Sequence, residues 1–131
     1  MSFSSDLYAF LTADGTLSGL VSNRIHPNRV PPNETFPYIR VQRVSNTPQI
    51  TLAGYNAHNE PTVQISIFSR TYDPAISIRD RLFALFDGYH ATMGTTVIQH
   101  VVPAGDQEFW EDGEPEGHHH FPVDFTFLIN V

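Results

Sequence analysis

Four segments of the chain alternate apolar and polar residues, the period-two pattern of strands that bury one face. They span residues 38–44, 63–67, 95–102 and 123–131. In the last segment Val123, Phe125, Phe127, Ile129 and Val131 are expected to point to one side. The 95–102 segment is so rich in β-branched residues that its pattern suggests burial on both faces.

Residues 4–21 show helical rather than alternating spacing. Leu7, Phe10 and Leu11 form an apolar stripe, and Ser4 or Ser5 is expected to cap the N-terminus. The Asp14-Gly15 pair interrupts the pattern, so the segment predicts either one helix or two short ones.

A second helix is predicted directly after the strand at 63–67. Asp73 is expected to cap it, Pro74 to take its first position, and Gly88 to end it in a left-handed conformation. The apolar face is expected to contain Ala75, Ile78, Leu82 and Leu85, with residues 79–81 on the outer side.

Together these elements predict an α+β fold in the order α-β-β-α-β-β, with helices packed on a mainly antiparallel sheet of about four strands. The length of 131 residues favours one domain, residues 1–131. Residues 23–37 are a proline-rich loop, 45–61 are expected to form an extended hairpin arm, and 103–122 are expected to be a second long loop.

Charge and composition exclude several functional classes. The chain has no cysteine, which removes disulfides, thiolate zinc sites and cysteine nucleophiles, and no lysine, which removes a P-loop and Schiff-base chemistry. Seven arginines lie within residues 1–81, whereas residues 82–131 carry eight acidic groups and no basic one. This distribution speaks against tight or sequence-specific DNA binding. No segment predicts a signal peptide or a membrane span.

The loop at 103–122 contains the residues best suited to bind a metal ion or a partner. His118 and His120 could form a His-x-His metal pair with nearby carboxylates, but a solvated loop is the simpler reading. The acidic run at 106–116 lacks the spacing of an EF-hand calcium loop. Phe109 and Trp110 either anchor a partner or fold back onto the core.

The order of short motifs along the chain resembles the tail terminator (tail-completion) family of long-tailed bacteriophages. These motifs are Arg24-Ile25-His26-Pro27, Pro37-Tyr38 through Arg43-Val44-Ser45, Val63-Gln64-Ile65 and Tyr72-Asp73-Pro74-Ala75. The likeness spans nearly the whole chain, while the acidic, histidine-bearing loop at 103–122 and the missing lysine depart from it.

The resemblance implies a small structural subunit of the virion tail, assembled in the cytoplasm of the host bacterium, with no enzyme activity, cofactor or membrane. Its partners would be copies of itself in a ring of six, the tail tube protein and the head–tail connector, while DNA passes through the channel without specific binding. The implied function is to cap the head-proximal end of the tube and halt its polymerisation. The first alternative is a neck subunit, and the second is a metal-dependent enzyme that uses His118 and His120.

The arms at 45–61 and 103–120 are expected to carry the contacts with neighbouring subunits, tube and connector. The expected interface residues are Arg40, Arg43, Tyr55, Arg70, Arg79, Arg81, Phe109 and Trp110. The acidic residues expected to line the channel are Asp106, Glu108, Glu111, Asp112, Glu114 and Glu116. An acidic wall would suit a channel through which DNA slides without sticking.

Overall fold

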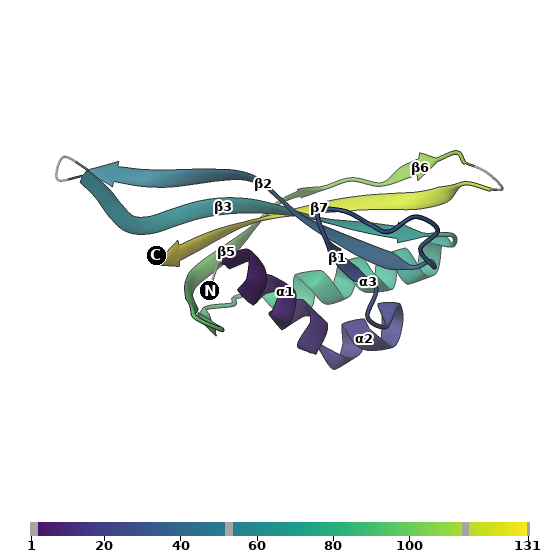
Figure 1. Ribbon diagram of the computed structural model, residues 1–131, viewed down its shortest axis with the longest axis horizontal. Coiled ribbons are helices and arrows are strands. Elements are labelled where there is room, and N and C mark those ends of the chain that lie inside the picture. Colours follow the sequence, from purple (N-terminus) through teal and green to yellow (C-terminus); the bar gives the residue numbers. More distant parts are fainter. Residues whose placement is uncertain (1–2, 52–53, 114–115, 131) are drawn as a thin grey trace.

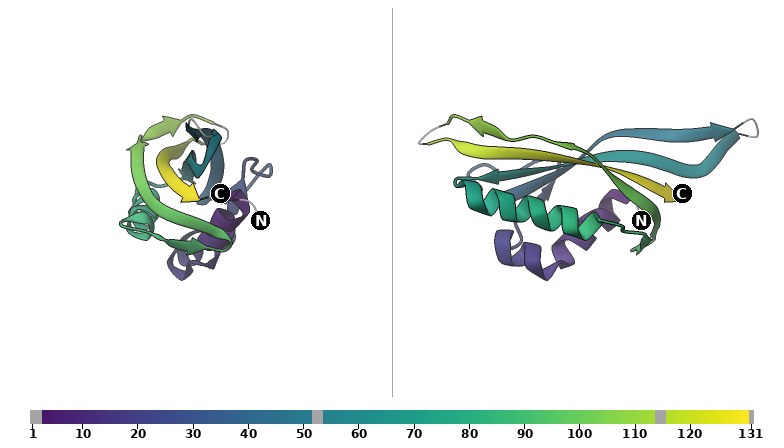
Figure 2. Two further views of the ribbon diagram at one scale, coloured as in Figure 1. Left: turned by 90° about the vertical axis from the view of Figure 1, so that its left-hand side faces the viewer. Right: turned by 180° about the vertical axis from the view of Figure 1, so that it is seen from behind.

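The computed structural model describes residues 3–51, 54–113 and 116–130. Three helices, α1 (Phe3–Ala13), α2 (Gly15–Val21) and α3 (Tyr72–Phe86), lie together on one face of a long sheet (Figure 1). The described strands are β1 (Ile25–Pro27), β2 (Tyr38–Thr51), β3 (Gly54–Ser69), β4 (Ala91–Met93), β5 (Thr96–Asp106), β6 (Phe109–Glu111) and β7 (His118–Asn130). Seen along its length, the sheet is curled rather than flat (Figure 2).

The strand order is β1-β2-β3-β7-β5-β4, and β6 pairs separately with β7. All pairs are antiparallel except β1 with β2. The α+β prediction is therefore confirmed, but the predicted count of about four strands and the predicted element order are wrong. The three added strands, β1, β4 and β6, have three residues each, too few for an alternating pattern to be recognised.

The core lies between the sheet and the helices. Val63, Ile65 and Ile67 of β3 are buried, and β7 buries Val123, Phe125, Phe127 and Ile129 as predicted, while Val131 lies outside the described residues. The helix α3 buries Ala75, Ile78, Leu82 and Phe86, so Phe86 takes the place expected for Leu85. This apolar layer holds the strands and helices as one rigid platform.

The expectation that β5 is buried on both faces is wrong. Val97 is 41% exposed and Val102 is 49% exposed, so the strand is buried on one face and not on two. The reason is that helices cover only one face of the sheet (Figures 1 and 2), so β-branched residues on the other face stay in contact with solvent. Composition alone does not distinguish these cases.

The helix ends correct other expectations. The cap residue of α3 is Thr71, which makes no side-chain capping bond, so Asp73 lies in the first turn and Pro74 is the third helical residue. Gly88 follows α3 with the left-handed φ of 67° that was expected. At the N-terminus α1 begins at Phe3, so neither Ser4 nor Ser5 is its cap.

Two projections extend from the platform. Strands β2 and β3 form one continuous antiparallel hairpin up to the pair Thr51 and Gly54, which confirms the predicted arm at 45–61. Residues 103–122 are not a loop as expected, because β5 continues to Asp106, β6 follows, and β7 begins at His118. The β2–β3 arm and the β6 end point in opposite directions along the longest axis (Figure 1).

Candidate interaction sites

Helix α3 holds the β6 end in place through ion pairs. The Arg79 guanidinium lies 2.6 Å from a carboxylate oxygen of Glu108 and 3.4 Å from one of Asp106. The Tyr72 hydroxyl donates a hydrogen bond to Glu108 over 3.0 Å. Hydrogen bonds from Arg79 and Tyr72 hold the pKa of Glu108 below its ordinary value. The segment that contains Asp106 and Glu108, at the junction of β5 and β6, is thus fixed to α3.

The other face of β6 carries a carboxylate between two histidines. Glu111 Oε1 lies 2.8 Å from Nε2 of His118, and its Oε2 lies 3.4 Å from Nδ1 of His120. The His120 ring stacks on Phe68, with ring centroids 4.4 Å apart, and burial lowers the pKa of His120. His118 and His120 therefore do share a face of β7. Within the described residues, however, no group of three or more histidine or acidic side chains is arranged to hold a metal ion.

The β6 tip, residues 109–113, exposes two large aromatic side chains. Trp110 is 54% exposed and Phe109 is 47% exposed. The Trp110 indole donates a hydrogen bond over 2.9 Å to Asp112, and its ring meets the His119 ring edge-on at 4.9 Å. The indole and the Asp112 carboxylate are therefore held together as a unit at the surface. The alternative that both aromatic rings fold back into the core is wrong.

Two further arginines pair with groups of the same chain. The Arg70 guanidinium donates to the backbone oxygens of Glu116 and Gly117, over 2.6 and 3.1 Å. Arg81 donates two hydrogen bonds to Asp14, over 3.0 and 2.6 Å, and these bonds lower the pKa of Asp14. Asp14 also caps α2 by accepting the N–H of Leu17. This double role explains why the chain breaks at Asp14 into two helices.

The predicted interface and channel residues are thus found in different settings. Arg70, Arg79 and Arg81 are paired within the chain, whereas Arg40 and Arg43 have no ion-pair partner among the described residues. Four of the predicted channel residues form hydrogen bonds or ion pairs within the chain: Asp106, Glu108, Glu111 and Asp112. A carboxylate oxygen of Glu116 lies 4.0 Å from the Arg70 guanidinium. Glu114 and the side chain of Tyr55 lie outside the described part of the chain. Interface and channel roles stay predictions.

The helix-free face of the sheet contains a small polar layer. Arg40 Nε, Ser66 Oγ, His120 Nε2 and Asp124 Oδ1 are buried without a hydrogen-bond partner among the described residues. Arg40 lies opposite Ser66 in the β2–β3 ladder. Buried polar atoms normally have hydrogen-bond partners, so these four atoms are exceptions within the described part of the chain.

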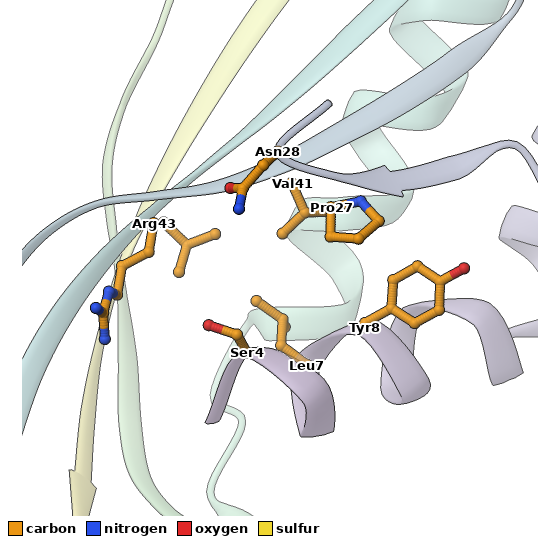
Figure 3. Close-up of a pocket in the computed structure, with 8 residues that line it drawn as sticks. Ser4, Leu7, Tyr8, Pro27, Asn28, Val41 and Arg43 are labelled. Carbon is orange, nitrogen blue, oxygen red and sulfur yellow. The ribbon is translucent and has the colours of Figure 1, made fainter. Parts of the chain in front are cut away.

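A pocket of about 350 Å³, here called the α1 pocket, lies where the β2–β3 arm leaves the platform (Figure 3). Helix α1 forms one wall and the strands β1 to β3 form the other. Its lining residues are Ser4, Leu7, Tyr8, Pro27, Asn28, Val41, Arg43 and Val63. Leu7, Val41 and Val63 give it an apolar floor, while Arg43 is exposed at one side and has no partner among the described residues.

A buried carboxylate fixes the wall formed by α1. Asp6, only 3% exposed, accepts hydrogen bonds from the Thr95 N–H, the Thr95 hydroxyl and the Thr96 hydroxyl, over 3.2, 2.9 and 2.6 Å. The Thr96 hydroxyl contributes most to lowering the pKa of Asp6. Gly94 passes directly beneath this carboxylate. The sequence pattern does not single out Asp6 or the pocket, because these contacts join residues 89 and 90 positions apart.

Three comparisons with known proteins bear on this arrangement. Residues 5–129 match the family model of the tail completion protein gp17. A solved chain from the virion of a native gene transfer agent particle has a TM-score of 0.77 at 14% identity, covering 99% of this chain and 96% of that one. A second solved chain has a TM-score of 0.56 at 14% identity, covering 98% and 91%. No curated protein sequence is similar enough to count as a match.

Proposed function

The chain belongs to the family of the tail completion protein gp17, and we propose that it forms a ring, of six copies, which caps the head-proximal end of the tail tube. As a member of this family it is a structural tail component of a phage-type virion and not an enzyme. None of the helices among the described residues is long and apolar enough to cross a membrane. In our proposal residues 1–131 act as one domain that ends tube polymerisation and binds the head connector.

The observation that carries the proposal beyond family membership is the pair of projections at opposite ends of a rigid platform (Figure 1). A subunit in a ring needs two different contact surfaces, one for each neighbour. The base of the β2–β3 arm, where the α1 pocket lies, and the β6 end supply such surfaces. The ion pairs of Arg79 with Glu108 and Asp106 keep the second projection in a fixed orientation, as a repeating contact requires.

The acidic half of the chain supports a channel role. Residues 82–131 carry eight acidic groups and no lysine or arginine, and a wall of this charge repels the phosphates of DNA. The intrachain partners of Glu108 and Glu111 reduce the repulsion between neighbouring carboxylates but leave the end net acidic. In our proposal DNA passes this wall without being bound.

The test is a tube assembly assay with purified tail tube protein. Added protein is expected to stop tube growth, and electron microscopy is expected to show an extra ring at one end of each tube. A neck subunit would instead bind the head connector and leave tube growth unchanged. Tubes that grow normally and carry no ring would contradict the proposed function.

A further inference from the structure

The two ends of the molecule differ in a way that suggests how copies join. The β6 tip exposes an indole and carries the carboxylate of Asp112, whereas the α1 pocket presents an apolar floor and the guanidinium of Arg43, which has no ion-pair partner among the described residues. We propose that the β6 tip of one copy docks in the α1 pocket of a second copy, with Trp110 over the apolar floor and Asp112 beside Arg43. This inference rests on the proposed ring and names its contact.

Charge complementarity selects a second copy as the occupant. The described part of the β6 end carries Asp106, Glu108, Glu111, Asp112 and Glu116 against the two guanidinium groups of Arg70 and Arg79. At the pocket, Arg43 is a cation without a carboxylate partner among the described residues. The first turn of α1, at Ser4, adds the positive end of a helix to the same rim.

The geometry of the two partners also agrees. Trp110 and Asp112 are joined by a hydrogen bond of 2.9 Å, so the aromatic ring and the charge are already placed together before docking. The pocket pairs an apolar floor with an arginine at its side in the same way (Figure 3). Tryptophan and arginine are the residues that most often dominate the binding energy of protein interfaces. The indole of Trp110 would therefore meet the apolar floor, and the carboxylate of Asp112 would meet the guanidinium of Arg43.

The two surfaces lie apart on the molecule, as a ring contact requires. The pocket lies at the base of the β2–β3 arm and the β6 tip lies toward the other end of the longest axis (Figure 1). A contact between two different surfaces is heterologous, and such a contact generates a ring when the rotation between copies closes. Two copies that made this contact reciprocally would form a closed dimer, whereas the proposed ring requires the second surface of each copy to meet a third copy.

Site-directed cross-linking tests the contact, because the chain contains no cysteine of its own. Ser4→Cys places a thiol at the pocket rim, and Gly113→Cys places one at the β6 tip, where an added Cβ comes no closer than 3.7 Å to other atoms. A mixture of the two variants is expected to form disulfide-linked pairs under mild oxidation. Neither variant is expected to form such pairs when it is oxidised alone. Ala9→Cys, exposed on the same helix, is the matched control and should not link to Gly113→Cys.

A charge swap tests the pairing itself. Arg43→Asp and Asp112→Arg are each expected to raise the dissociation constant of self-association by about 10- to 100-fold. The two changes combined in one chain should bring it back to within about threefold of the original. Trp110→Ala should weaken association by about 30-fold, while Phe109→Ala, on the other face of the strand, should not.

The outcomes separate this inference from the proposed function. Rings that form without the Ser4–Gly113 cross-link, and that tolerate Arg43→Asp, would overturn the docking contact and leave the ring standing. A cross-link from Gly113→Cys to the tube protein would also overturn it, since the tip would then serve another partner. Protein that stays monomeric even when bound to tube ends would contradict both.

Discussion

A methyl group at Gly94 should damage the structure far more than one at Gly88. Both glycines have left-handed φ values, 60° and 67°, so alanine strains the backbone equally at each. Their surroundings differ, because a Cβ at Gly88 meets no atom within 4 Å, whereas a Cβ at Gly94 comes within 2.7 Å of Asp6 Cγ. Asp6 cannot move away without losing its bonds to Thr95 and Thr96.

The expected losses of stability follow from the backbone strain at both glycines and from the clash with Asp6 at Gly94. Gly88→Ala should lower the free energy of unfolding by about 1 kcal/mol, the cost of the left-handed conformation alone. Gly94→Ala adds the overpacking of a tight site and should cost about 2–4 kcal/mol in total. For a chain of this size, 1 kcal/mol corresponds to a change in Tm of about 4 °C. The expected losses are about 4 °C and about 8–16 °C.

Differential scanning calorimetry of the two variants and the parent protein measures this difference. Hydrogen exchange in α1 should also rise in Gly94→Ala, because the carboxylate that fixes this helix is displaced, and should stay unchanged in Gly88→Ala. Equal Tm losses for the two variants would refute the reasoning, since the approach of Gly94 to Asp6 would then have no energetic consequence.

Three other predictions concern the charged groups. Asp14→Asn should keep the cap of α2, because asparagine caps a helix about as well as aspartate, but should remove the charge that pairs with Arg81, so urea unfolding should show a loss of about 1 kcal/mol. Because the folded-state pKa of Asp14 lies below its unfolded value, its stabilisation is complete above that value and is lost as pH falls; Tm below pH 4 should therefore decline less steeply in Asp14→Asn than in the parent. Arg79→Ala should release β6 from α3, so hydrogen exchange at 106–111 should accelerate while exchange in α2 stays the same.

The regular parts of the fold were predictable because each carries its own local signal. The alternation in 123–131 identified β7, the spacing of Ala75, Ile78 and Leu82 identified α3, and seventeen residues between two strands indicated a hairpin arm. The short strands β1, β4 and β6 depend on pairing with neighbours, so no local pattern marks them. The sequence predicts a loop for the β5–β6–β7 end, because the polar residues of these strands obscure the alternation.

The candidate sites were predictable only as residue types. The sequence indicated Trp110 and the acidic run as candidates, and Arg79 and Arg81 as expected interface residues. Within the chain they pair with Glu108 and Asp14. The α1 pocket has no local sequence signal, because it forms only when α1, held through Asp6 to Thr95 and Thr96, lies beside strands that are distant in sequence.

The most direct test of the central claim is electron microscopy of tail tubes assembled in the presence of the purified protein. The account predicts one additional ring at a single end of each tube, of sixfold symmetry, and tubes that no longer elongate when more tube protein is added. Tubes with bare ends that continue to elongate, or protein bound along their sides, would contradict it.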